Sequence, residues 1–180
     1  MTPQAALERG LGELALTLPP GASGKLMAYL GLLAKWNKTY NLTAIRDPLQ
    51  GVSHHLLDSL AVVRDLSACA GTLADVGSGG GLPGIPIAIA EPARRVTLND
   101  ASEKKGAFLR QAVIELGLSN ATVHVGRVEE WRPAEGFAVV ISRGCSQVSG
   151  ASSATGPGGQ VRSSSQRSCR CPCGPGGYAP

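Results

Sequence analysis

A glycine-rich loop at residues 75–81 carries the clearest chemical signal in this chain. Its sequence, Asp-Val-Gly-Ser-Gly-Gly-Gly, follows a short apolar segment and precedes a stretch suited to begin a helix. Gly77, Gly79 and Gly81 permit a tight turn, and without Cβ atoms they let a ligand lie against bare backbone. The setting of strand, loop and helix therefore predicts a cradle for a nucleoside cofactor.

Two cofactor classes fit these glycines. Gly79, Gly81 and Gly84 match the dinucleotide pattern G-x-G-x-x-G, which would indicate an NAD-linked oxidoreductase. Asp75, two residues before Gly77, favours S-adenosylmethionine, because a carboxylate beside a helix N-terminus repels a diphosphate but attracts a sulfonium and an ammonium. We therefore favour S-adenosylmethionine, and isothermal titration with both cofactors would distinguish the two.

Asp100 lies 23 residues after Gly77, at the end of the next apolar segment. An acid at this spacing accepts hydrogen bonds from ribose hydroxyls in both cofactor classes. The alternative is that Asp100 caps a helix beginning near Ser102. Asp100 thus supports a nucleoside site without choosing its ligand.

The surrounding pattern predicts the elements that hold these residues. Apolar positions at helical spacing in residues 25–36, and Asp47-Pro48 as a helix start, indicate that the N-terminal third is helical. Strands and helices then alternate, which favours a parallel sheet with helices on its faces. The expected strands are 72–76, 95–100, 122–125 and 137–141, and the expected helices are 83–90 and 104–116.

Composition sets broad limits on function. No run of 18 apolar residues and no cleavable leader pattern is found, so we expect a cytoplasmic protein that does not enter a membrane. The net charge is +4, but residues 144–180 contain three arginines and no acid, which leaves +1 for residues 1–143. Overall charge is therefore no argument for RNA binding.

The composition changes abruptly at Gly144. Residues 144–180 contain no Leu, Ile, Phe, Lys, Asp or Glu, so we expect a disordered, low-complexity tail. Its four cysteines lack the spacing of a zinc site, and no metal is expected. The bias towards Ser, Arg, Cys, Pro and Gly suggests a reading-frame shift near codon 144, and a coding DNA without a leucine-rich continuation in either other frame would refute this.

Several motifs in order closely resemble the bacterial glucose-inhibited division protein B family. They are Trp36-Asn37-Lys38-Thr39-Tyr40-Asn41-Leu42-Thr43, Arg46-Asp47-Pro48, His55-Leu56-Leu57-Asp58-Ser59, residues 75–86, Arg127-Val128-Glu129-Glu130 and Ile141-Ser142-Arg143. The resemblance covers about residues 25–143. It implies a Rossmann-like class I methyltransferase that modifies guanine N7 of small-subunit (16S) ribosomal RNA, and it implies that Gly77, Leu82, Val128, Glu129 and Arg143 line the cofactor pocket.

The resemblance also divides the chain. We expect an N-terminal helical extension at 1–70, an S-adenosylmethionine-binding core at 71–143, and the tail at 144–180. The family's Ile-Ser-Arg normally leads into a helix and further strands, so the C-terminal strands are expected to be missing. The fourth strand would then be an exposed apolar edge, and we predict a monomer that is poorly folded or inactive.

Guanine N7 has a free lone pair, so its methylation needs positioning and no general base. We therefore expect no catalytic side chain, and we interpret His54 and His55 as helix packing or capping residues. Trp36 is expected in the core. The candidates for phosphate contacts are Lys35, Lys38, Arg46, Arg94, Arg95, Lys104 and Lys105. The alternative for most of them is a solvated helix face, which we favour for Lys104 and Lys105. A non-catalytic RNA-binding remnant is the other alternative, and it would transfer no methyl label.

Overall fold

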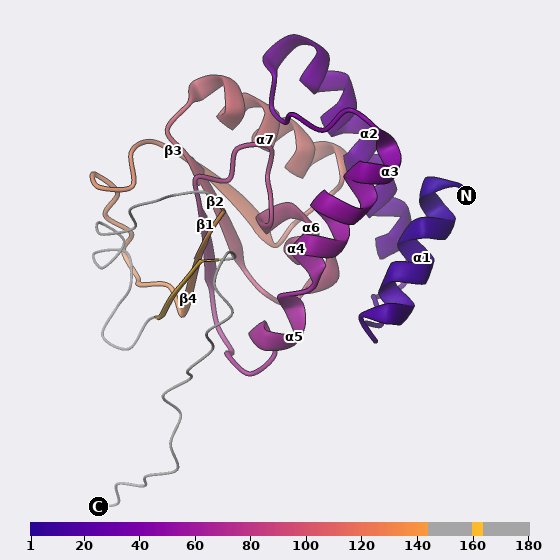
Figure 1. The fold of residues 1–180 in the computed structure, drawn as a ribbon. Coiled ribbons are helices and arrows are strands. Elements are labelled where there is room, and N and C mark those ends of the chain that lie inside the picture. Colours follow the sequence, from indigo (N-terminus) through magenta and orange to yellow (C-terminus); the bar gives the residue numbers. More distant parts are fainter. Residues whose placement is uncertain (144–159, 164–180) are drawn as a thin grey trace, which may run out of the picture.

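A parallel sheet with the strand order β3-β2-β1-β4-β5 forms the centre of the molecule, a computed structural model that describes residues 1–143 and 160–163 (Figure 1). In this sheet Asp75 pairs with Leu98 on one side and with Ile141 on the other. The four expected strands are confirmed, with ends shifted by one or two residues. The strands are β1 Leu73–Val76, β2 Val96–Asp100, β3 Ala121–Val125, β4 Val139–Ser142 and β5 Gln160–Ser163.

Two helices connect the first three strands. They are α6 (Gly84–Ala90) between β1 and β2 and α7 (Glu103–Glu115) between β2 and β3, as the sequence predicted. The N-terminal third is helical as expected, although its middle part is broken into short pieces. Its elements are α1 Pro3–Glu13, α2 Ala22–Tyr40, α3 Pro48–Gly51, the π-helix η1 Val52–Leu57, α4 Asp58–Leu60 and α5 Val63–Leu66.

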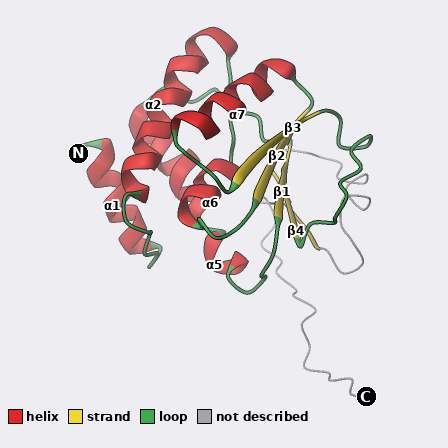
Figure 2. Cartoon of the chain, turned by 180° about the vertical axis from the view of Figure 1, so that it is seen from behind, coloured by secondary structure: helices red, strands yellow, loops and turns green. Residues whose placement is uncertain are grey.

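The described helices all lie on one side of the sheet (Figure 2). Strand side chains alternate between the faces, so Leu73 and Leu98 point into the large core beneath the helices. Ala74, Val76 and Val140 point the other way, onto a smaller cluster. The N-terminal helices share the large core with the sheet, since Leu7, Leu26 and Leu56 belong to the same cluster as β1. Within the described residues, no helix is long and apolar enough to cross a membrane.

The fifth strand corrects one expectation. Residues 160–163 were expected to be disordered, but they pair in parallel with β4, from Val139 opposite Gln160 to Ser142 opposite Ser163. That expectation is wrong for these four residues because strand pairing uses backbone N–H and C=O groups, which do not require an apolar composition. β4 is therefore not an open edge. The rest of the expected tail, 144–159 and 164–180, lies outside the described residues, as do its four cysteines.

Candidate functional site

The glycine loop turns sharply between the end of β1 and the start of α6. Gly77, Gly79 and Gly81 have φ angles of 73°, 58° and 86°, in the left-handed region that favours glycine. A Cβ added to Gly79 would meet open space, with the carbonyl oxygen of Gly77 as its nearest neighbour at 3.9 Å. At Gly79 the loop thus presents bare backbone beside open space, which any larger residue would partly fill. Tyr29, fully buried in α2, supports it from below by donating its hydroxyl to the Gly80 carbonyl at 2.6 Å.

Asp100 joins the end of β2 to this loop. Its Oδ2 accepts a hydrogen bond from the Gly79 N–H at 2.9 Å, and its Oδ1 accepts one from the Ser102 N–H at 2.9 Å. The second bond is the helix-start interaction that we weighed as the alternative role for Asp100. The Lys105 ammonium lies 3.7 Å from Oδ2. Each carboxylate oxygen has a further lone pair, so the bonds to the chain leave acceptor capacity for ribose hydroxyls.

Asp75 lies on the helix-covered face, beneath the loop. It is fully buried, and its Oδ2 accepts from the Gly84 N–H at the start of α6 at 2.9 Å. Burial raises the pKa of this carboxyl from 3.8 to about 7, because the ionised form loses its hydration. Its Oδ1 has no hydrogen-bond partner in the described structure. Asp75 thus supports the loop with one oxygen and keeps the other unsatisfied.

Arg143 follows β4 and links the strand ends to the N-terminal helices. Its Nη2 donates to the His54 carbonyl at 2.7 Å and forms an ion pair with the Asp58 carboxylate, also at 2.7 Å, and its buried Nη1 makes no hydrogen bond among the described residues. His55 packs inside this junction, where its Nε2 lies 2.8 Å from Thr43 Oγ1. Burial lowers the pKa of His55, which fits the packing role expected for it.

The loop after β3 carries Val128 and Glu129. The Gly126 N–H donates to the Asp100 carbonyl at 3.0 Å, so this loop starts beside the end of β2. Val128 packs on the smaller hydrophobic cluster, and Glu129 is exposed, with its carboxylate 3.7 Å from Arg127. Leu82 is buried and precedes Pro83 through a cis peptide bond. The structure thus brings Gly79 and Asp100 into direct contact and places the other predicted residues on neighbouring loops.

Two residues that sequence reasoning missed organise these loops. The Asn99 side-chain amide donates to the Gly126 carbonyl at 2.9 Å and holds the start of the β3 loop. Its signal was a polar residue inside an apolar strand. Tyr29 had no signal of its own, because it stands in the apolar stripe of a core helix.

The residues present fit S-adenosylmethionine. The bare backbone at Gly79 and the carboxylate of Asp100 beside it suit an adenosine. The buried Asp75 Oδ1 and Arg143 Nη1, both without partners, suit the ammonium and the carboxylate of an amino acid. A diphosphate fits less well, because Asp75 already occupies the first turn of α6 with its carboxylate.

Most candidates for phosphate contacts are exposed, but Arg94 is not. Its guanidinium donates to the carbonyls of Leu66, Cys69 and Gly71 and forms an ion pair with Glu91. The prediction of a phosphate contact is therefore wrong for Arg94, which ties the chain before β1 to the chain before β2. The exposed candidates are Lys35, Lys38, Arg46, Arg95 and Lys104.

The aromatic residues of α2 divide between core and surface. Trp36 packs edge-on against Phe108 with a centroid distance of 5.6 Å, as expected for a core residue. Tyr40 stacks on Trp36 and stays 43% exposed. Tyr40 is therefore the aromatic of α2 that remains open to a nucleic acid base.

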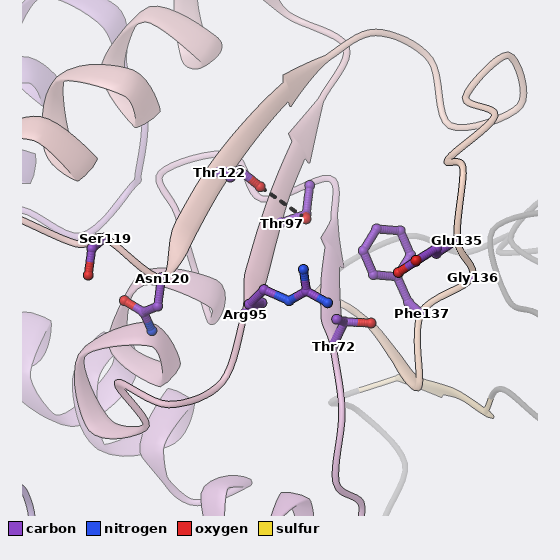
Figure 3. A pocket seen from close by; sticks show the side chains of 9 residues that line it. All are labelled: Thr72, Arg95, Thr97, Ser119, Asn120, Thr122, Glu135, Gly136 and Phe137. Atoms are coloured by element: carbon purple, nitrogen blue, oxygen red, sulfur yellow. Dashed lines mark hydrogen bonds between the residues drawn. The ribbon is translucent and has the colours of Figure 1, made fainter.

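A cavity of about 220 Å³ lies away from these residues, on the helix-free face (Figure 3). It is lined by Thr72, Arg95 and Asn120, which precede β1, β2 and β3, together with Thr97 and Thr122. The cavity thus sits at the amino ends of the strands, whereas ligands of open α/β sheets bind at the carboxyl ends. None of the residues predicted for the cofactor site lines it, and Arg95 is the one candidate for a phosphate contact that does.

Comparisons with known proteins agree with this arrangement. Residues 22–161 match the family model described as GidB, rRNA small subunit methyltransferase G. The proteins named ribosomal RNA small subunit methyltransferase G from Aromatoleum aromaticum and Methylobacillus flagellatus are 55% and 52% identical to it. The alignments cover 80% and 81% of this chain and 70% of each relative.

Solved structures confirm the Rossmann-like class I methyltransferase fold. A putative S-adenosylmethionine-dependent methyltransferase from Methanococcus maripaludis superposes with a TM-score of 0.55 at 18% identity, over 74% of this chain and 61% of that one. Coclaurine N-methyltransferase gives a TM-score of 0.52 at 12% identity, over 88% and 56%. At such low identities the likeness concerns the fold alone.

Proposed function

Since the chain belongs to the GidB family, the small subunit rRNA methyltransferases G, we propose that it transfers the methyl group of S-adenosylmethionine to N7 of a guanine in 16S ribosomal RNA. The observation that carries this proposal is the bond from Gly79 N–H to Asp100. It joins a glycine loop to an acid at the carboxyl ends of two adjacent strands, the edge at which open α/β sheets bind nucleoside cofactors.

The proposed cofactor site consists of two groups of residues. Gly77, Gly79, Leu82 and Asp100 form the first, around the glycine loop, and Asp100 would accept from the ribose hydroxyls. Val128, Glu129 and Arg143 form the second, with Val128 and Glu129 beside the adenine. Support for grouping them comes from the hydrogen bond between Gly126 and Asp100, which starts the β3 loop at the same edge.

The proposed reaction requires guanine N7 to be aligned with the methyl group of the cofactor. When bound, S-adenosylmethionine would supply a methyl group on a sulfonium; the N7 lone pair forms the new C–N bond as the C–S bond breaks, and the sulfur keeps the electron pair. No proton moves, so no general base is required. The chain's residues would hold the cofactor and orient the guanine, which must leave its stack to reach the site.

The proposed substrate also bears on where the enzyme acts. With 16S RNA as the substrate, we propose that the enzyme acts in the cytoplasm and as a monomer. We further propose that residues 71–143 form its cofactor-binding core. Exposed Lys38 and Lys104, on α2 and α7, would contact RNA phosphates. Membership of the methyltransferase family argues against the oxidoreductase alternative.

Methyl transfer can be measured directly. The chain is incubated with labelled S-adenosylmethionine and small-subunit RNA that lacks its native methylation, and the labelled nucleoside is identified after digestion. Label in 7-methylguanosine is expected. RNA binding without label would instead favour the non-catalytic remnant. A frame-restored version, run in parallel, tests the prediction that this chain is impaired; equal rates and a cooperative thermal transition would refute that prediction.

A further inference from the structure

One side chain, Arg143, connects the N-terminal helices to the carboxyl ends of the strands. Its Nη2 donates to the His54 carbonyl oxygen at 2.7 Å and forms an ion pair with Asp58 Oδ2, also at 2.7 Å. A guanidinium has five N–H groups, and two of them are on Nη1. Nη1 is buried and makes no hydrogen bond in the described structure, so its N–H groups remain for another partner.

An irregular helical turn presents both acceptors to that nitrogen. Residues Val52–Leu57 form a π-helix, and the Asp58 N–H that follows donates to the carbonyls of Ser53 and His55. The carbonyl four residues before Asp58, that of His54, accepts from Arg143. Single π-helical turns are frequent at functional sites. Here the π-helical turn places the His54 carbonyl and the Asp58 carboxylate beside the same nitrogen, Arg143 Nη2.

The exposure of this contact indicates that it orients the Arg143 guanidinium and adds little stability. The Asp58 side chain is 56% exposed and that of Arg143 is 30% exposed. Ion pairs this open to water contribute little to the free energy of unfolding, because solvent screens them. A short hydrogen bond and a short ion-pair contact to the same nitrogen nevertheless restrict the plane of the guanidinium. The contact therefore affects the direction of the remaining N–H groups more than the stability of the fold.

We infer that Asp58 is a positioning residue, which together with the His54 carbonyl holds Arg143 Nη2 so that its remaining N–H groups face an oxygen acceptor of the bound ligand. The inference rests on the proposed function. Arg143 follows Ser142, which pairs with Val76 directly before the glycine loop. The ligand oxygens of this chemistry that the proposed reaction brings to the site are the carboxylate of the cofactor's methionine and O6 of the guanine.

Calorimetry and kinetics distinguish the two sources. S-adenosylhomocysteine, which carries the same carboxylate, is titrated into the full chain and into Asp58→Asn, Asp58→Glu and Arg143→Lys. If the acceptor is the carboxylate, Asp58→Asn raises the Kd of S-adenosylhomocysteine about tenfold, as expected for a misplaced binding group. If it is guanine O6, that Kd is unchanged, and kcat/KM for RNA falls by about the same factor.

Further variants separate orientation from folding. Asp58→Glu keeps the negative charge, so it should recover most of the binding or of the kcat/KM that Asp58→Asn loses. In an Arg143→Lys background, Asp58→Asn should have little further effect, because both changes remove one interaction. Glu13→Gln is the matched control, since Glu13 forms an exposed ion pair with Arg9 at 2.9 Å on α1. It should leave both constants unchanged.

The inference is overturned if Asp58→Asn alters neither the Kd nor kcat/KM. It is also overturned if the effects of Asp58→Asn and Arg143→Lys simply add. Failure of the unaltered chain to bind S-adenosylhomocysteine would overturn the proposed function, and this inference with it. Normal binding with an inert Asp58→Asn would overturn the inference alone.

Discussion

Asp100 and Gly79, 21 residues apart in the chain, are joined by a 2.9 Å hydrogen bond from the Gly79 N–H to the Asp100 carboxylate. The bond gives Asp100 two tasks. It closes the glycine loop against β2, and, under the proposed function, it holds the carboxylate that accepts from the ribose.

Replacing Asp100 with Ala should therefore weaken cofactor binding through both tasks. Hydrogen bonds to charged groups are worth about 1.5–3 kcal/mol, so we expect the Kd for S-adenosylhomocysteine to rise by roughly ten- to a hundredfold. Isothermal titration measures this. Glu103→Gln is the control, because Glu103 is 80% exposed and lies 3.9 Å from Arg110. An Asp100→Ala variant that binds normally would contradict the assignment.

Tyr29→Phe should loosen the loop from below. The substitution removes only the hydroxyl that bonds the Gly80 carbonyl at 2.6 Å. A buried acceptor left without its donor costs about 1–3 kcal/mol, so urea unfolding should show a loss of this size together with weaker binding of S-adenosylhomocysteine. Tyr40→Phe changes an exposed tyrosine and should alter stability by less than about 0.5 kcal/mol. Equal effects of the two substitutions would argue against the support role.

Much of this site could be predicted from the sequence, because its main parts follow local rules. The glycines at 77, 79 and 81 and the acid at 100 stand at strand ends, and strand ends can be read from apolar runs. The partners of Arg143 could not be predicted, since Asp58 and His54 lie more than 80 residues away and only the tertiary fold brings them together. The π-helix could not be predicted either, because its composition does not differ from that of an ordinary α-helix.

Two glycines should respond in opposite ways to alanine. A Cβ on Gly84 would lie 2.6 Å from Asp75 Oδ2 and would also press on Leu98, so Gly84→Ala should lower the free energy of unfolding by about 1–3 kcal/mol. A Cβ on Gly31, within α2, would have no neighbour within 4 Å. Gly31→Ala should therefore raise the free energy by about 0.5–1 kcal/mol through helix propensity. Urea denaturation of both variants tests the packing of the α6 start; a neutral Gly84→Ala would contradict it.

Asp75 should make stability depend on pH. Its pKa is about 7 in the fold, against 3.8 ordinarily, so the folded state holds the proton more tightly than the unfolded state. This contribution is complete below about pH 4 and is lost as the pH rises through 7. Asp75→Asn cannot ionise, so the variant should gain stability relative to the natural chain across this window, by about 1.4 kcal/mol for each unit of the pKa difference. Thermal or urea unfolding at pH 4 to 8 measures the difference in the free energy of unfolding between the variant and the natural chain. A difference that does not change with pH would contradict the prediction.

Arg94 and Lys104 should separate folding from RNA binding. Arg94 is nearly buried and donates to three backbone carbonyls, so Arg94→Ala should cost roughly 3 kcal/mol of stability by removing two part-buried hydrogen bonds and one exposed hydrogen bond together. Lys104 is exposed in the first turn of α7, four residues after Asp100 at the end of β2. Lys104→Ala should therefore leave stability within about 0.5 kcal/mol but weaken RNA binding and reduce its salt dependence by the equivalent of about one phosphate contact. Filter binding to small-subunit RNA at several salt concentrations checks this. A Lys104→Ala variant with unchanged affinity and salt slope would place the RNA on another surface, and an Arg94→Ala variant of normal stability would restore Arg94 as a candidate phosphate contact.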